Sequence, residues 1–548
     1  MSHKHPSMRT ETLGRHLLVA AGFLLVLIPA ALAPRLAWAQ GMGYEESLAR
    51  LSDRSFAVKA AALEAIAADG DERAVSLFQG LLQGEVFYRK SDRRILYAEK
   101  SEAGYRIRDA SSREDLGTVG KRKIRQVSLN NRLRRWLRGT LAGLTLDSPD
   151  PRIRLAAVRE MTGDGKAAAR LRTRLPVEKD EGVHAALELA IALDDLNAEA
   201  TDTRLAAISV LGSSLEPQVR NRLATLAGQG KDPRVVAAAR QALSGIELRL
   251  RLNAGAETLF FGLSLGSVLV LAAIGLAITF GVMGVINMAH GELVMLGAYT
   301  TYLVQQAMPD AGGYSLLVAI PAAFLVSGLF GIAIERLVIR FLYGRPLETL
   351  LATFGISLVL QQLVRTAISA QNVVVENPAW MSGSLRINPV LALTYSRIAI
   401  LVFAILVFFG LLLILKRTTL GLQVRALSQN RAMARAMGVR SARVDALAFG
   451  LGAGTAGLAG VALSQLTNVG PNMGQAYIID SFMVVVFGGV GNLWGTFIGG
   501  LTLGVANKFM EPWVGTVLAK ILVLVFIILF IQRRPQGLFP QRGRALET

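Results

Sequence analysis

Long apolar stretches in the second half of the chain constrain its fold more than any other feature. About 18 or more apolar residues in a row can cross the roughly 30 Å hydrocarbon core of a bilayer as a helix. Nine apolar stretches lie near 259–280, 287–306, 315–339, 347–368, 397–415, 445–466, 478–490, 493–510 and 514–531. We therefore predict an all-α protein whose residues 254–540 form a polytopic transmembrane bundle.

The first half of the chain has a different composition. Residues 40–253 are rich in Arg, Asp, Glu and Ala. The formal net charge of +19 would suit a nucleic-acid binder, but excess Lys and Arg is the usual result of positive-inside loops in a membrane protein. We therefore expect contact with lipid and not with nucleic acid. The sequence has no cysteine, which excludes disulfides and cysteine nucleophiles.

Residues 1–39 have the pattern of a secretory signal peptide. A basic start precedes an apolar stretch at 17–33, and Ala37-Trp38-Ala39 predicts cleavage after Ala39. An uncleaved anchor helix is the alternative. Either way, residues 40–253 are expected to be periplasmic.

This exported domain is predicted to be mainly helical. Asp150-Pro151-Arg152 and Asp232-Pro233-Arg234 each place Asp at a helix N-cap and Pro at the first helical position. Their separation is about two periods of the roughly 40–47 residues of HEAT-like helix pairs. The alternative is an irregular helical domain without a true repeat.

Two segments depart from that pattern. Residues 85–119 contain short aromatic and β-branched runs, which predict a small β-hairpin insertion. Residues 121–138 hold eight basic residues and no acidic one. We expect a solvated basic helix there, with contact to lipid headgroups or an acidic partner as the alternative. No catalytic or metal-binding constellation stands out, so we expect neither an enzyme nor a cofactor.

Loop charges predict the orientation of the bundle. The loop 416–443 carries seven Lys and Arg and no acid, so it is expected on the cytoplasmic side. Counting crossings back from it places residue 258 outside, in agreement with the signal peptide. The basic tail at 541–548 is cytoplasmic only if the short stretch 478–490 also crosses. We thus expect a multi-pass protein of the bacterial inner membrane.

Small residues suggest close helix packing. Glycines at 450, 452, 454, 457 and 460 lie in one apolar stretch, where they let helices approach closely. Residues 280–287 and 487–492 are similar, which suggests an internal repeat, a common device in transporters.

Polar side chains at membrane depth are candidates for contact with a solute. Asn287 and His290 are three residues apart, on one face of a helix, and Glu292 is close by. The structural alternative is that they cap or satisfy helix ends. Gln361, Gln465, Asn468 and Asp480 are weaker candidates that also fit interhelical hydrogen bonds. Glu335 and Arg336 lie near the end of a stretch and are expected to snorkel.

Three segments resemble a known family. Residues 279–292 with 295–299 are similar to the signature of LivH-type permeases, which import branched-chain amino acids and related amides. Residues 425–439 resemble the ATPase-docking loop of that family, and 484–495 are a third match. The resemblance covers residues 258–540. It implies a coupling role for Arg425, Ala426, Asn430, Arg431, Arg435 and Gly438.

The resemblance also implies partners. The sequence lacks the Gly-x-x-x-x-Gly-Lys-Ser/Thr phosphate loop, so ATP would be used by partner subunits. The implied complex contains a second related permease, two cytoplasmic ATPases and a periplasmic solute-binding protein. The segment 426–438 would transmit ATPase motion to the bundle; a basic loop held by lipid charge is the alternative.

The same comparison suggests a substrate. The exported domain, residues 373–384 and residues 534–539 resemble the urea-type (UrtB-like) permeases of the family. We therefore expect urea import, with branched-chain amino acids or short amides as the alternative. From other classes, a passive channel with a regulatory exported domain and a membrane-bound scaffold or sensor remain open.

Overall fold

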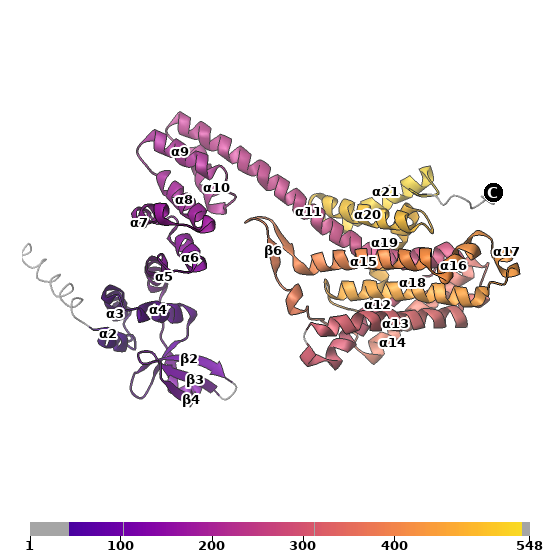
Figure 1. Ribbon diagram of the computed structural model, residues 1–548, viewed down its shortest axis with the longest axis horizontal. Helices are drawn as coiled ribbons and strands as arrows, with labels where there is room; N and C mark the ends of the chain where they lie inside the picture. Colours follow the sequence, from indigo (N-terminus) through magenta and orange to yellow (C-terminus); the bar gives the residue numbers. More distant parts are fainter. Residues whose placement is uncertain (1–42, 102–103, 312, 540–548) are drawn as a thin grey trace, which may run out of the picture. The chain divides into compact units, whose positions relative to one another are not determined.

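The computed structural model describes residues 43–101, 104–311 and 313–539, so the predicted signal peptide and the tail at 541–548 lie outside the described residues. The chain divides into two compact units, Met1–Ile246 and Glu247–Thr548 (Figure 1).

The first unit consists mainly of short helices. They are α2 (Tyr44–Arg50), α3 (Phe56–Asp69), α4 (Arg73–Gln83), α5 (Asn131–Thr145), α6 (Pro151–Met161), α7 (Ala168–Arg174), η2 (Leu175–Val177), α8 (Glu181–Asp195), α9 (Thr201–Leu211) and α10 (Pro217–Gln229). Along the chain, α5 packs on α6, α6 on α8 and α8 on α9. Both predicted helix starts are confirmed: Asp150 Oδ1 accepts from Arg152 N at 2.8 Å, and Asp232 Oδ1 from Arg234 N at 3.0 Å.

The predicted hairpin insertion is a five-stranded antiparallel sheet that extends to Gln126. Its strands are β1 (Val86–Arg89), β2 (Ile95–Ser101), β3 (Gly104–Asp109), β4 (Asp115–Val119) and β5 (Ile124–Gln126), in the order β4-β3-β2-β1-β5. The expectation of one basic helix after it is wrong, because η1 (Lys121–Lys123) and β5 precede α5. Residue Arg125 of β5 pairs with Tyr88 of β1, which draws this part of the basic segment into the sheet.

Aliphatic packing and one buried ion pair hold the first unit together. Leu63, Leu77 and Phe78 are fully buried between α3, α4 and α5. Further along, Arg154 Nη2 of α6 lies 2.7 Å from Glu178 Oε1. The Arg154 hydrogen bonds, opposed by burial, lower the pKa of Glu178 to about 2.

The second unit is a helical bundle. Its helices are α11 (Pro233–Met283), α12 (His290–Ala307), η3 (Pro309–Ala311), α13 (Tyr314–Leu337), η4 (Ile339–Phe341), α14 (Pro346–Ala367), η5 (Ala379–Met381), α15 (Tyr395–Arg417), α16 (Thr419–Gln429), α17 (Arg431–Ala436), α18 (Ser441–Ser464), α19 (Met473–Gly488), α20 (Leu493–Val514) and α21 (Thr516–Arg533). A small hairpin of β6 (Ser384–Arg386) and β7 (Ala392–Thr394) precedes α15.

Every predicted apolar stretch corresponds to one of these helices. Within the described residues, six helices are long and apolar enough to cross a membrane, and α19 is a shorter apolar helix of 16 residues. Helix α11 differs from expectation, because one helix of 51 residues joins the predicted start at Pro233 to the first apolar stretch. Its first residues belong to the first unit and its last to the second.

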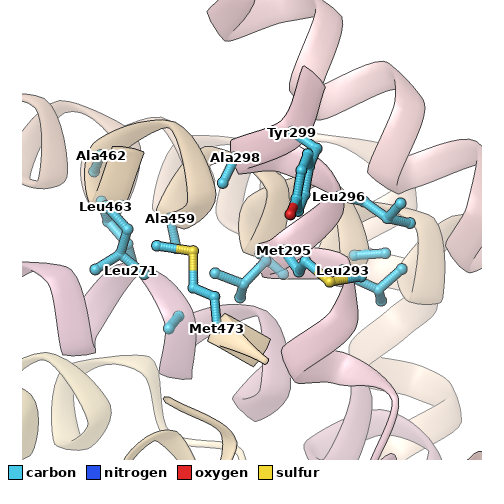
Figure 2. Packing of buried hydrophobic residues seen from close by; sticks show 14 of the residues in the cluster. Leu271, Leu293, Met295, Leu296, Ala298, Tyr299, Ala459, Ala462, Leu463 and Met473 are labelled. Carbon is cyan, nitrogen blue, oxygen red and sulfur yellow. The ribbon is translucent and has the colours of Figure 1, made fainter. Parts of the chain in front are cut away.

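Helices α11, α12 and α18 form the centre of the bundle. In the most apolar 18-residue stretch of α18, 89% is buried inside the protein, whereas the corresponding share in the peripheral α21 is 17%. Glycines set this packing: a Cβ at Gly460 of α18 would lie only 2.6 Å from Ala298 N of α12. Figure 2 shows Tyr299 of α12 beside Ala298 and Leu296, with Ala459 of α18 nearby.

Candidate functional site

The chain between α11 and α12 is not helical, and part of it is buried, including Val285, Asn287 and Ala289. Gly284 has a φ of +66°, a left-handed conformation that ends α11 and that glycine adopts without steric cost. Residues 284–287 are irregular, and α12 begins at His290. The expectation that Asn287 and His290 share a helical face is therefore wrong. Irregular backbone at this depth is typical of places where protein surrounds it.

Asn287 and His290 each keep one atom without a partner. Asn287 Oδ1 accepts from Ala289 N at 3.0 Å, and its Nδ2 has no hydrogen bond. His290 Nε2 lies 2.8 Å from the Ala272 carbonyl of α11. Because a carbonyl only accepts, this nitrogen carries the proton and Nδ1 is left as a free acceptor.

Glu292 is held by α14. Its Oε1 accepts from Ser357 Oγ at 2.9 Å and from Gln361 Nε2 at 2.7 Å. Its Oε2 has no hydrogen-bond partner, although the residue is only 1% exposed. The free oxygen faces α19, where a Cβ at Gly474 would approach it to 2.8 Å. Glu292 therefore retains hydrogen-bonding capacity inside the bundle.

The two α14 partners of Glu292 belong to a buried row that sequence reasoning mostly missed. Thr349, Thr353, Ser357 and Gln361 recur every four residues and are all buried; we call them the α14 polar row. Thr353 Oγ1 also accepts from Met288 N at 3.1 Å, so the row lies along both the α11–α12 break and Glu292. The signal was present in the sequence, since small polar residues at that spacing mark one face of an apolar helix.

The remaining candidates do not join this group. Gln465 ends α18, where Nε2 donates to Ser464 Oγ at 3.1 Å and Oε1 is unpaired. Asn468 is exposed in the turn after α18. Asp480 of α19 forms an ion pair with Lys520 of α21 at 3.1 Å. The structure thus brings Glu292 together with Gln361 of the α14 polar row, and the row also contacts Met288, the residue after Asn287.

The predicted coupling segment forms two short helices, α16 and α17. Thr418 caps α16, and Asn430 Oδ1 caps α17 by accepting from Met433 N at 2.9 Å. Gly438, with a φ of +88°, ends the pair. Arg435 Nε donates to Ser441 Oγ at 2.9 Å, Arg425 donates to the Leu415 carbonyl, and Ala426 packs against the bundle. Met433 and Met437 are exposed on the outer side.

One buried ion pair fastens α17 to the bundle. Arg431 forms an ion pair with Asp445 of α18, whose side chain is 2% exposed. The Arg431 guanidinium also lies 4.6 Å from the centre of the Tyr343 ring. Sequence reasoning missed Asp445, because it lies 14 residues from Arg431 and only the fold brings the two together.

Glu335 also corrects an expectation. Its side chain is 2% exposed, so it does not snorkel to the membrane surface. Its only nearby cation among the described ion pairs is Arg336, whose Nε is 3.7 Å from Glu335 Oε2.

Comparisons with known proteins agree with this architecture. The family model described as branched-chain amino acid transport system / permease component matches residues 258–531, which include the α11–α12 break, the α14 polar row and the coupling segment. No solved structure matches the chain.

Curated relatives have the same description. The permease protein BraD of the high-affinity branched-chain amino acid transport system of Pseudomonas aeruginosa is 33% identical over 291 residues, which are 52% of this chain and 94% of that protein. LivH of Escherichia coli K12 is 29% identical over the same coverage, and the probable LivH of Methanocaldococcus jannaschii is 25% identical over 50% of this chain and 88% of its own length. The chain belongs to the permease-component family of branched-chain amino acid transport systems, and it is therefore a multi-pass transport subunit and not an enzyme.

Proposed function

We propose that the second unit lines the solute path of an ATP-driven importer of the bacterial inner membrane that takes up branched-chain amino acids or short amides. The observation that carries this proposal is Glu292, buried at the centre of the bundle with one carboxylate oxygen free. An ammonium or amide N–H group of a solute would complete the hydrogen bonding of that oxygen. The relatives, named for branched-chain amino acid transport, favour this substrate class.

Urea is the second candidate, and the chemistry of the free atoms favours it. Among the candidate residues, three buried atoms without a hydrogen-bond partner are acceptors, Glu292 Oε2, His290 Nδ1 and Gln465 Oε1, although Gln465 lies apart from the other two. One is a donor, Asn287 Nδ2. No Lys or Arg is buried in 247–311 or 313–539, so an amino-acid carboxylate would find no buried cation there. Urea is neutral and offers four N–H donors, which suits a path rich in acceptors. The first unit, which lies outside the matched residues 258–531, also sets this chain apart from its relatives.

Transport would be driven from the cytoplasmic side. In this proposal, two partner ATPases contact the exposed surface of α16 and α17, where Met433 is 61% exposed and Met437 79%. Because Arg431 ties α17 to Asp445, movement of α17 would pull on the central helix α18. A second permease would complete the path, and a periplasmic binding protein would deliver the solute.

Uptake of labelled leucine and labelled urea at micromolar concentration tests the proposal, in cells with and without the gene and with ATP depleted. Gene- and ATP-dependent leucine uptake that urea does not inhibit supports the first substrate class, and the reverse pattern supports urea. Uptake that continues without ATP would point to a passive channel. Failure of both solutes to depend on the gene would contradict the proposal.

A matched pair of variants tests Glu292. We expect Glu292→Gln to lower uptake about tenfold, because a charge-assisted hydrogen bond is worth about 1.5 kcal/mol or more. Glu348→Gln, an exposed carboxylate on α14, is the control and should leave uptake unchanged. Equal uptake in both variants would remove Glu292 from the path.

A further inference from the structure

The basic segment, residues 121–138, carries positive charge that the first unit does not neutralise. All of its cations are exposed, and none takes part in an ion pair in the described structure. They are Lys121, Arg122, Lys123, Arg125, Arg132, Arg134, Arg135 and Arg138.

Elsewhere in the same unit, arginines commonly have carboxylate partners. Arg106 pairs with Asp115, and Arg172 pairs with both Asp194 and Asp195. The basic segment contains no acidic residue, so none of its cations can pair with a carboxylate within these 18 consecutive positions. Its charge is therefore available to another molecule.

Neighbouring elements add to the positive charge of the basic segment. Lys90 N donates to the Lys123 carbonyl at 3.0 Å, which brings a further cation beside the segment. Lys59 is buried next to it, and its Nζ donates to the Ser128 carbonyl at 2.8 Å. Burial lowers the pKa of Lys59, and the charge of Arg125 lowers it further.

A groove adjoins the helical part of the basic segment. It lies between α4, α5 and α6 and encloses about 400 Å³. Two cations, Arg138 and Arg152, and one exposed acid, Glu160, line it. The other lining residues are mostly apolar: Leu141, Ala142, Ala156 and Ala157, with the polar Gln79 and Thr145. Ile153, another lining residue, is 40% exposed. Arg134 and Arg135 precede Arg138 by one turn of α5, so the cations of the helix lead to the groove.

We propose that the basic segment and this groove dock an acidic surface, with an apolar side chain at its centre, on the solute-binding protein of the importer. The cations supply charge complementarity, and the apolar floor supplies a place for a side chain. A lipid surface would use the cations but not the recessed apolar floor. Protection of the edge strand β5 by charge would account for Arg125 but not for the cations on α5. The proposal rests on the proposed function and on the predicted periplasmic location of this unit.

The test uses the full chain with its partner permease and ATPases, in nanodiscs to measure binding and in proteoliposomes to measure uptake. The purified solute-binding protein is the probe. In Arg134→Glu/Arg138→Glu, we expect the association rate to fall about tenfold and its salt dependence to weaken, because surface cations steer encounter. Arg220→Glu/Arg222→Glu reverses two exposed, unpaired arginines on α10 of the same unit and should bind like the wild type.

The outcomes separate this inference from the proposed function. If the α5 variant shows both weaker binding and lower uptake than the wild type, the docking surface is supported. Normal uptake and binding in the α5 variant would overturn it, while leaving the proposed function intact. Absence of any wild-type uptake would contradict the proposed function itself. If the α5 variant loses uptake only in bilayers with phosphatidylglycerol and still binds the solute-binding protein normally, the cations contact lipid. That outcome would also overturn the proposal.

Discussion

The two units are both helical, yet different contacts hold them together. In the first unit, large aliphatic side chains fill the space between helices, and charges pair at the surface or in one buried cluster around Glu178. In the second unit, backbones meet directly at glycines, and large apolar side chains point outward, as Leu351 and Leu406 do. The second unit also buries large apolar side chains, such as Leu271 and Phe449, so the two units differ in the glycine contacts and in the apolar outer surface.

The surrounding solvent explains this difference. In water, burial of apolar surface drives helices together, so a helix needs bulky residues on its inner face. Lipid is as apolar as leucine, so helices in a bilayer gain mainly from close packing and from buried hydrogen bonds. Close glycine contacts therefore matter most in the second unit, and buried ion pairing is a feature of the first; each can be tested by its removal.

The largest effect is expected at the glycine contacts. Gly297→Leu of α12 would place a side chain against the backbone of Gly457 in α18. We expect a cost of about 3 kcal/mol, the upper range for an overpacked core, and little folded protein. Thermal stability in detergent measures it.

Gly410→Leu is the control for this change. Gly410 lies in α15 with no atom near the position of a Cβ, so the variant should remain stable. Equal stability of the two variants would contradict the role of glycine in packing.

In the first unit, the largest effect is expected at the buried ion pair. Glu178→Gln leaves Arg154 without its carboxylate and should cost about 3 kcal/mol. Hydrogen exchange of peptides from α6 to α8 measures the loss in the intact protein. Glu188→Gln, which removes an exposed carboxylate near His184, should have almost no effect.

The same pair predicts a dependence on pH. Because folding lowers the pKa of Glu178 from 4.5 to about 2, its contribution is fully present above pH 4.5 and is lost as the pH falls toward 2. Glu178→Gln should abolish this part of the acid sensitivity of α6 to α8. Identical acid profiles in the variant and the wild type would argue against the assignment.

A moderate effect is expected at the anchor of the coupling segment. Arg431→Met should lower ATP-driven uptake about tenfold, equivalent to roughly 1.4 kcal/mol, because α17 loses its tie to α18. Because Arg431→Met also leaves the buried Asp445 without its cation, uptake is measured per amount of folded protein, with thermal stability in detergent measured beside it. Arg417→Met, an exposed change before α16, is the control. ATP hydrolysis that persists without uptake would identify uncoupling, whereas unchanged uptake would refute the anchor.

The smallest effect is expected at Lys59. Its buried ammonium has no ion-pair partner in the described structure and bonds to Ser128, so Lys59→Met should change stability by less than about 1 kcal/mol. Since folding lowers the pKa of Lys59, the free energy of unfolding of the wild type should rise toward pH 10.5, and the variant should lose this rise. Hydrogen exchange of α3 checks both points. A large loss of stability would show that Ser128 depends on the ammonium.

Much of the bundle was predictable because the length and apolarity of membrane helices are visible in the sequence. The predicted caps at Asp150 and Asp232 were likewise local, since an N-cap and a first-turn proline act within a few residues. The continuity of α11 was not predicted, because the change from polar to apolar sequence well after Pro233 suggested two separate elements. The polar residues in between are good helix formers, which explains why the helix continues.

The candidate site was harder to predict because its contacts are tertiary. Glu292 and Gln361 were both candidates, but their hydrogen bond joins helices through residues 69 positions apart in sequence. Ser357 and Thr353 were overlooked because single hydroxyls in an apolar helix usually bond to their own backbone. Asp445 was overlooked because its partner depends on how α17 folds back against α18.

The two similar segments 280–287 and 487–492 meet in the structure, where a Cβ at Gly281 would lie 2.6 Å from Gly491 Cα. Each segment ends at an asparagine that caps the next turn of the chain, since Asn492 accepts from Trp494 N as Asn287 accepts from Ala289 N. The chain also has no native cysteine. A cysteine introduced in each segment, with nothing to remove beforehand, would thus turn this contact into a reporter: cross-linking during turnover would reveal whether the two similar segments separate as solute passes.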